Sequence, residues 1–430
     1  MLKDLQLERL EDLFTQVPDR LKLKAVDLPE PLSEIELVQY FNELGGLNQL
    51  VAPTLNFLGG GASHRFSPAI VNAIISRPEF YSAYTPYQAE ASQGWLQAIY
   101  EYQTMIALLS GLDVANASMY DGATALAEAA MMATVHTGRQ NVVVAGALHP
   151  EYAQVLRTYS DGQGYEVLRV PPAANGRVDV ERLRQAVTAT TAAVILQQPN
   201  FYGILEMPEP ISEIAHQSGS LFIACIDPIS VGVLRSPGDY GADIAVGDGQ
   251  PLGIPLSFGG PYVGFMACRD ALLRRIPGRL VGATVDDLGR RGYVLTLQAR
   301  EQHIRREHAT SNICTNHALM ALAATVYLAR MGGVGLRQLA ELSAQRAHWL
   351  ADAVVRRPGY RMAFDAPFLF EFVLHTPHHA EQIQAQMLER GVLPGLPLGR
   401  FEPALANALL VAVTELNDRS ALERYVEALP

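Results

Sequence analysis

The strongest constraint on the fold is an alternation, through the middle of the chain, between short apolar runs and helical or turn-rich stretches. The apolar runs are continuous and rich in β-branched residues, which is typical of strands buried on both faces. Because helical or turn-rich sequence separates the runs, the pattern predicts an α/β fold with a mostly parallel sheet between layers of helices. The predicted strands are 141–148, 165–170, 192–198, 221–227, 242–247 and 262–268.

The chain, at 430 residues, is long enough for more than one domain. Residues 1–60 are predicted to form an N-terminal helical arm, in which Ser33 and Glu36 match a capping box. Residues 61–320 contain the predicted strands and form the predicted large α/β domain. Residues 321–430 are predicted to form a smaller α+β domain that begins with a long helical stretch. The other elements expected there are strands at 368–374 and 409–414, a helix at 380–390 and a final helix.

Charge and sequence pattern argue against several classes of partner and location. The formal net charge of −11 disfavours binding to nucleic acid or to an anionic membrane surface. The start of the chain has charges every few residues and no apolar core, so no secretory signal is predicted. The longest apolar run, Ala318–Ala329, is shorter than the ~20 residues that a membrane span needs. Because of this short apolar run, we expect a soluble protein. The three cysteines, Cys225, Cys268 and Cys314, form no CxxC pair, which favours a location in the cytoplasm.

Common catalytic and metal-binding motifs are absent from the sequence. There is no GxSxG elbow, HExxH, CxxC pair or P-loop. The segment beginning Gly247-Asp-Gly249 does not fit a dinucleotide-binding GxGxxG, because Gly253 comes one place late. His303 and His308 lie five positions apart, which does not place two ligands on one helical face, so no metal site is expected.

The segment Tyr120–Glu128 leads from a turn directly into an alanine-rich helix. Backbone N–H groups of Gly122, Ala123 and Thr124 at this helix start could bind an anion. Asp121, however, occupies the N-cap position and can accept those hydrogen bonds itself, so capping is the favoured interpretation. The two alternatives exclude each other, because a phosphate beside Asp121 would meet a like charge.

A tyrosine-rich loop precedes a second helix, which is expected from about 92 to 110 with Ser92 as its N-cap and Gly111 at its end. The loop comprises Tyr84, Thr85, Pro86, Tyr87 and Gln88. Its side chains could line a cleft or could pack against the body of the protein, and packing is favoured on residue type alone.

Lysine is nearly absent. Of 33 basic residues, only Lys3, Lys22 and Lys24 are lysine, and none lies in the predicted α/β domain. Drift of composition towards arginine is the simplest explanation. The chemical consequence is the same whatever the cause, because an aldehyde cofactor forms a Schiff base with an ε-amine and not with a guanidinium.

Several long stretches resemble a known family. They include GDGQPLGIPLSFGGPYVGFMACR, REQHIRREHATSNICTNHAL and GLPLGRFEPALANALLVAVTE, together with the segment from FLGGGASHRF through YDGATALAEA. These stretches resemble the first subunits of bacterial two-subunit glycine decarboxylases, the P-proteins of the glycine cleavage system. The resemblance covers about residues 5–430.

The resemblance implies a pyridoxal-phosphate (PLP) dependent transferase fold of type I, with a large, mostly parallel domain and a smaller C-terminal domain. In this family two homologous subunits pair, and only the second carries PLP on a lysine. The lysine of its HKTFSIPHGGGGPG segment falls on Gln250 when the shared IP and GGP are matched. The resemblance therefore implies a degenerate site without a cofactor, whose members are Asp121, Gly122, Ala123, Thr124, Asp227 and Gln250.

Two of these positions have a specific counterpart in the PLP-bearing subunit. Asp121 stands at the start of the helix that corresponds to the phosphate-binding turn, where a small hydroxyl residue is expected. Asp227 corresponds to the carboxylate that pairs with the pyridine nitrogen. The resemblance assigns no role to His308, where the family often has lysine.

The resemblance implies that this chain is the subunit without PLP and that it is inactive alone. It would work in an αβ or α2β2 complex with the PLP-bearing subunit 2. The complex decarboxylates glycine and transfers the aminomethyl group to the lipoyl arm of the H-protein. No catalytic residue is expected in this chain; Tyr84, Thr85, Tyr87 and Gln88 are the candidates for cleft lining or the interface. The alternative is a purely structural or regulatory subunit that contributes nothing to the active site.

Overall fold

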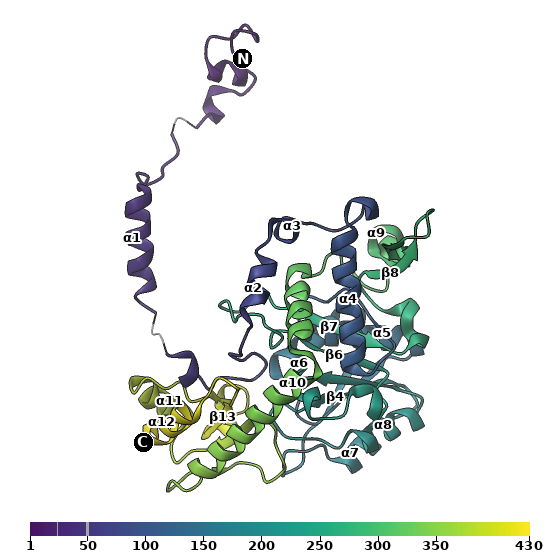
Figure 1. Ribbon diagram of the computed structural model, residues 1–430, viewed down its shortest axis with the longest axis vertical. Helices are drawn as coiled ribbons and strands as arrows, with labels where there is room; N and C mark the ends of the chain where they lie inside the picture. Colours follow the sequence, from purple (N-terminus) through teal and green to yellow (C-terminus); the bar gives the residue numbers. More distant parts are fainter. Residues whose placement is uncertain (24, 49–50) are drawn as a thin grey trace. The chain divides into compact units, whose positions relative to one another are not determined.

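The computed structural model describes residues 1–23, 25–48 and 51–430 (Figure 1). The chain divides into two compact units, Met1–Leu50 and Val51–Pro430. Residues 51–60, predicted to belong to the arm, fall in the second unit in this division, and the domain limits at 60 and 320 stay predictions. Lys24, Gln49 and Leu50 of the predicted arm lie outside the described residues.

The first unit contains one α-helix, α1 (Glu34–Gly45), within its described residues. The predicted capping box is confirmed, because Ser33 accepts from the Glu36 backbone N–H while the Glu36 carboxylate accepts from that of Ser33. No described side chain of this unit is buried.

The second unit is built on a seven-stranded sheet with the order β1-β7-β6-β5-β4-β2-β3. Five neighbouring strands, from β3 across to β6, are parallel. All six predicted strands are present, which confirms the α/β fold class. The strands are β1 (Val114–Ala115), β2 (Asn141–Ala145), β3 (Glu166–Val170), β4 (Thr191–Gln198), β5 (Leu221–Ile226), β6 (Ile244–Asp248) and β7 (Gly264–Cys268).

The direction of β7 differs from the sequence prediction. The run 262–268 was expected to join a parallel sheet, but β7 pairs antiparallel with β6. The physical reason lies in the connection, since residues 249–263 form turns and contain no helix. A parallel return would need a crossover connection, usually helical.

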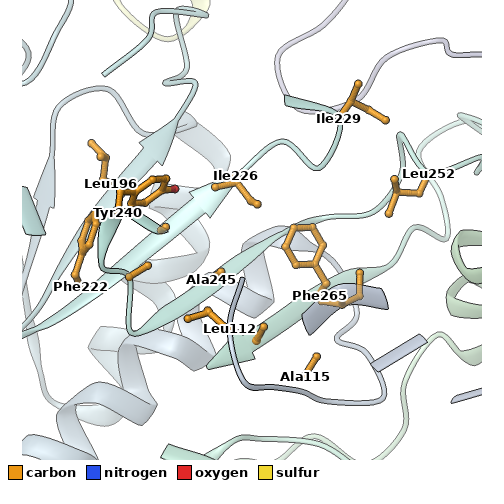
Figure 2. Close-up of a cluster of buried hydrophobic side chains, with 14 of the residues drawn as sticks. Leu112, Ala115, Leu196, Phe222, Ile226, Ile229, Tyr240, Ala245, Leu252 and Phe265 are labelled. Atoms are coloured by element: carbon orange, nitrogen blue, oxygen red, sulfur yellow. The ribbon is translucent and has the colours of Figure 1, made fainter. Parts of the chain in front are cut away.

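Helices cover both faces of this sheet, as predicted. Along β2, Val142 and Val144 belong to one buried cluster with α5 and α6, whereas Val143 belongs to the other with α4, α8 and α10. Figure 2 shows part of the second cluster, in which Phe222 and Phe265 project from neighbouring regions of the sheet. The helices of this domain are α2 (Ala69–Ile75), α3 (Pro78–Tyr81), α4 (Gln93–Ser110), α5 (Gly122–Thr137), α6 (Pro150–Gln163), α7 (Val180–Ala186), α8 (Pro208–Gln217) and α9 (Gln302–Arg305).

The predicted ends of α4 are correct in position, although the N-cap makes no bond. Ser92 stands at the N-cap, but its side chain accepts no capping hydrogen bond. Gly111 ends the helix in the left-handed conformation, with φ 66°, which glycine adopts without steric cost. Beyond this domain core, β8 (Leu280–Val285) and β9 (Arg291–Thr296) form a separate antiparallel pair.

The C-terminal part contains a four-stranded antiparallel sheet with the order β10-β11-β13-β12. The strands predicted at 368–374 and 409–414 are confirmed as β11 and β13 with shifted ends. The elements are α10 (Ala318–Val354), β10 (Arg361–Met362), β11 (Glu371–His375), α11 (Ala380–Glu389), β12 (Leu396–Pro397), β13 (Ala408–Ala412) and α12 (Arg419–Ala428).

Helix α10 is longer than the apolar run Ala318–Ala329 suggested, and it bends at Gly332, whose φ is 61°. Within the described residues it is the one helix long and apolar enough, by length and composition, to cross a membrane. However, 44% of its apolar stretch is buried inside the protein. Ala324 and Tyr327 of this stretch are fully buried in the core of the large sheet, so α10 is a core helix.

A buried ion pair joins the start of the second unit to the end of its small sheet. Arg65 Nη1 lies 2.8 Å from Glu415 Oε2, and both side chains are almost completely buried. The other carboxylate oxygen accepts a hydrogen bond from the Phe66 backbone N–H at 2.6 Å. Glu415 therefore holds residues 65 and 66 through one charge and two hydrogen bonds.

Replacing Glu415 with alanine should lower the free energy of unfolding by about 3–5 kcal/mol, because the Arg65 charge would remain buried without a partner. The control is Glu423→Ala on α12, whose exposed pair with Arg419 at 2.6 Å should contribute no more than ~1 kcal/mol. Urea unfolding followed by circular dichroism measures both. Equal losses for the two variants would contradict the importance assigned to the buried pair.

Candidate functional site

A cavity of about 80 Å³ lies at the carboxyl ends of the central parallel strands. Gln197 in β4, Asp227 just after β5 and Asp248 at the end of β6 contribute to its wall. Arg65 and Glu371 line it from outside the large sheet. A single water needs ~10–15 Å³ by the same kind of measure, so the cavity has room for several waters or one small ligand. Its position is the one where open α/β sheets bind ligands.

The start of α5 is capped by Asp121, as favoured from the sequence. Asp121 Oδ1 accepts a hydrogen bond from the Thr124 backbone N–H at 2.8 Å. In return, the Asp121 backbone N–H donates to Thr124 Oγ1 at 3.2 Å. Both halves of a capping box are present. The cap position of Asp121 is therefore confirmed.

A second carboxylate, from Asp248, also binds the start of α5. Asp248 Oδ2 accepts from the Gly122 backbone N–H at 3.0 Å, and its Oδ1 accepts from the Gln250 backbone N–H at 2.8 Å. Burial raises the pKa of Asp248 to about 7, although these two hydrogen bonds act in the opposite direction. Sequence reasoning missed this residue; its only signal was its place two residues before Gln250.

Gln250, predicted from the sequence to stand at the position of a PLP-binding lysine, is a buried structural amide. Its Oε1 accepts from the Ser63 backbone N–H at 3.1 Å. Its Nε2 donates to the carbonyl oxygens of Ser63 and Ile254 at 3.0 and 2.8 Å. Gln250 does not line the cavity; it fastens the segment around Ser63 to the turn after β6. Its three hydrogen bonds use the whole amide.

Asp227 and Glu371 face the cavity from two different domains. Asp227 Oδ1 accepts from the Ile229 backbone N–H at 2.7 Å, and Glu371 Oε1 accepts from that of Gly60 at 2.7 Å. Desolvation raises the pKa of Glu371 to about 7, and the nearby Asp227 adds to the rise while Arg65 opposes it. The structure thus brings Asp227 into the cavity, as expected of a site residue, together with an unforeseen second acid.

His149 closes another part of the cavity wall. Its Nε2 lies 2.5 Å from the Gly60 carbonyl oxygen, while its Nδ1 accepts from the Glu151 backbone N–H at 3.1 Å. This pairing assigns the proton to Nε2 of a neutral ring. Burial lowers the pKa of His149, consistent with the neutral form. The sequence signal that was overlooked is its place just after the predicted strand 141–148.

The tyrosine-rich loop lies apart from this cavity, because none of Tyr84, Thr85, Tyr87 and Gln88 lines it. Tyr84 and Tyr87 are exposed, as is Gln88, while Thr85 is half-buried. Tyr87 Oη accepts from Arg279 Nη2 at 3.1 Å, and the guanidinium lies 5.5 Å from the centre of the tyrosine ring. Tyr87 therefore both packs and remains open to solvent.

Arg279 belongs to a buried and incompletely paired group beneath Tyr87. Its Nε lies 4.0 Å from Glu301 Oε2, with the two side chains 4% and 6% exposed. Arg279 Nε and Glu301 Oε1 have no hydrogen-bond partner among the described residues. The His303 ring lies edge-on to that of Tyr87 at 6.3 Å. We call Tyr87, Arg279, Glu301 and His303 the Tyr87 cluster.

The described residues contain no group of three or more His, Cys, Asp or Glu side chains that could hold a metal ion. His303 Nδ1 lies 3.7 Å from Glu301 Oε2, and the exposed His308 lies 3.4 Å from Glu307. The absence of a metal site therefore stays a prediction, and no role is assigned to His308.

The cavity residues do not fit a covalently held aldehyde cofactor. No lysine follows Lys24 in the sequence, so no ε-amine can reach the cavity from residues 51–430. The N–H groups of Gly122 and Thr124 already donate to Asp248 and Asp121. The attachment point that such a cofactor needs is missing, and two of the three candidate anion-binding donors at the start of α5 are already occupied.

Comparison with known proteins gives one consistent result. The family model described as "Glycine cleavage system P-protein" matches residues 1–429. The chain is 52% identical over 424 residues to "Probable glycine dehydrogenase (decarboxylating) subunit 1" of Desulforamulus reducens, covering 98% of this chain and 95% of that protein. It is 51% identical over 430 residues to the protein with the same description in Carboxydothermus hydrogenoformans, covering 100% and 96%.

Solved structures agree with these relatives. A crystal structure of glycine decarboxylase (P-protein) of the glycine cleavage system, in inhibitor-bound form, superposes with a TM-score of 0.91 at 46% identity. That match covers 100% of this chain and 97% of the other. The sphingosine-1-phosphate lyase of Burkholderia pseudomallei has a TM-score of 0.68 at 16% identity, over 95% and 92% of the two chains, which shows a shared fold alone.

Stability should depend on pH through the buried acids. Between the ordinary glutamate pKa of 4.5 and about 7, folded Glu371 keeps a proton that the unfolded chain has released. The free energy of unfolding therefore falls as pH rises through this window. Asp248 and Glu128, with pKa values also raised to about 7 by burial, act in the same direction.

Glu371→Gln should reduce this pH-dependent loss by roughly a quarter. It removes one of four buried carboxyl groups with a raised pKa, the fourth being Glu206. Thermal unfolding measured by circular dichroism between pH 4.5 and 8 would test it, with the surface variant Glu423→Gln as the control. A Glu371→Gln profile parallel to that of the wild type would disprove the assignment of Glu371 as a titrating group.

Proposed function

The chain belongs to the glycine cleavage system P-protein family, and on that premise we propose that it is the subunit of a two-subunit glycine decarboxylase that carries no PLP. The family is PLP-dependent, yet this chain has no lysine beyond Lys24. That single observation supports the proposal most directly. The proposed partners are the PLP-bearing subunit 2 and the lipoylated H-protein, and the substrate of the complex is glycine.

The proposed roles of this chain and of its PLP-bearing partner follow from the chemistry of the cavity. PLP, when bound to the partner, supplies the electron sink that decarboxylation of an amino acid requires. In this chain Gln250 offers no amine and uses its amide in three hydrogen bonds within the fold, while carboxylates occupy backbone donors at the start of α5. Its residues maintain the fold of one half of the complex and bind no cofactor covalently.

The Tyr87 cluster is the part of this chain that we propose to line the cleft shared with the partner. Tyr81, Tyr84 and Tyr87 follow one another on a short segment and are 71%, 77% and 55% exposed. Tyrosine is enriched where two proteins meet, because its ring packs while its hydroxyl can still form a hydrogen bond. Beneath Tyr87, the buried Arg279 and Glu301 retain unpaired polar atoms that a partner surface could satisfy.

The N-terminal unit has an apolar helix side that needs burial against another surface. Along α1, Ile35, Val38 and Phe41 occupy one side of the helix and are 72%, 54% and 61% exposed. Because the described residues of this unit bury no side chain, they have no core of their own. Apolar helices of this kind are stabilised by burial against another surface.

We propose that the complex resides in the cytoplasm, where Cys225, Cys268 and Cys314 would stay unpaired, as they are here.

The proposal predicts that the purified chain alone releases no CO2 from glycine and that addition of subunit 2 restores the activity. After incubation with PLP and borohydride, subunit 2 should carry the reduced cofactor, and residues 51–430 of this chain should carry none, because they contain no ε-amine. Mass spectrometry of the separated subunits is the measurement. A phosphopyridoxyl adduct within residues 51–430 of this chain would refute the proposal.

Tyr87→Phe should lower kcat of the assembled enzyme by about tenfold. The substitution removes the hydroxyl that accepts a hydrogen bond from Arg279. A hydrogen bond to a charged group contributes ~1.5–3 kcal/mol. The matched control is Tyr81→Phe, on the same exposed segment, which should leave kcat unchanged. Size-exclusion chromatography verifies that both complexes assemble. Unchanged kcat for Tyr87→Phe in an intact complex would favour the purely structural role.

A further inference from the structure

The start of α5 is an anion-binding position that the chain fills with its own carboxylates. A helix N-terminus presents unpaired N–H groups and the positive end of the helix dipole, so it ordinarily attracts anions such as phosphate. Here Asp121 Oδ1 accepts from Thr124 N–H at 2.8 Å, and Asp248 Oδ2 accepts from Gly122 N–H at 3.0 Å. One carboxylate comes from the helix cap and the other from the end of β6.

The space in front of this helix start is filled as well. A Cβ atom added to Gly122 would collide with Tyr152 Oη and would lie 2.8 Å from the Asp248 backbone nitrogen. Tyr152 and Asp248 also line the cavity, so they form the wall between the cavity and the helix. A phosphate group approaching from the cavity would meet the Tyr152 side chain, the Asp248 backbone and the Asp248 carboxylate that already occupies the Gly122 N–H.

We propose that Asp248, together with Asp121, is a built-in replacement for a phosphate group, and that it closes the cavity of this chain to phosphate-bearing ligands. This inference deepens the proposed function, because it adds a second barrier to PLP that is independent of the missing lysine. Since Asp248 also accepts from the Gln250 N–H, the same carboxylate positions the turn that bears Gln250.

Electrostatics strengthens the closure. A phosphate carries one to two negative charges near neutral pH, and a carboxylate within a few ångströms repels it. The wall acid Asp227 adds to the negative field of the cavity, and Glu371 adds to it as the pH rises above its raised pKa of about 7. The nearby cation Arg65 is already paired with Glu415. Removal of Asp248 would therefore free two backbone donors, those of Gly122 and Gln250, and remove a like charge at once.

Inorganic phosphate binding to the assembled complex, measured by isothermal titration calorimetry, tests the inference. Asp248→Ala should add one phosphate site for each copy of this chain, at least tenfold tighter than any additional site in the wild type. The double variant Asp121→Ser/Asp248→Ala should bind phosphate more tightly still. Sites on the partner contribute equally to every sample and cancel in the comparison.

The matched control is Asp243→Ala, at the opposite end of the β6 region, where a carboxylate also accepts from a backbone N–H, that of Phe222 at 2.8 Å. It should add no phosphate site. If Asp248→Ala does not assemble, Asp248→Ser decides, because it removes the charge and shortens the side chain that fills the position. An unchanged number of sites in the assembled variants, or an equal gain in Asp243→Ala, would overturn the inference.

The readout is independent of glycine turnover. Failure of this test would leave the proposed function untouched, because a chain without lysine still lacks the attachment point for PLP. Conversely, an adduct on this chain in the borohydride experiment would refute the proposed function without restoring the anion site at α5.

Discussion

Backbone N–H groups at the first turn of α5 must be hydrogen-bonded where they are buried, and this requirement shapes the whole carboxyl end of the sheet. Asp121 and Asp248 meet it from within the chain, at Thr124 and Gly122. Because Asp248 also binds the Gln250 N–H, the turn after β6 is positioned by the same carboxylate. The cavity that remains is small and acidic, and it contains no group that could hold an aldehyde covalently.

Buried polar pairs join the segment around residues 60–66 to the rest of the protein. Gln250 binds both backbone groups of Ser63, Glu371 binds Gly60, and Glu415 binds Arg65. Each of these bonds spans well over a hundred residues of sequence and connects that segment to the large or the small sheet. Gln250, Glu371 and Glu415 therefore serve the architecture of this chain.

Two separate regions therefore contribute to function in different ways. The cavity shows what the chain lacks, while the Tyr87 cluster is the region that we propose to meet the partner. The Tyr87 cluster holds a buried arginine and glutamate with unpaired atoms, which is costly in an isolated chain. That cost is consistent with a surface completed by a second subunit.

The sequence by itself determined the α/β class, the strand positions, the caps at Ser33 and Asp121 and the missing amine, because periodicity, capping and composition are local properties. The tertiary structure alone decided that β7 runs antiparallel to β6. It also decided which remote residues meet: Asp248 and Gly122 are 126 positions apart in the sequence, Tyr87 and Arg279 are 192 apart, and Glu371 and Gly60 are 311 apart. Such contacts depend on how the whole chain closes around its core, and a single sequence contains no direct measure of distance between remote residues.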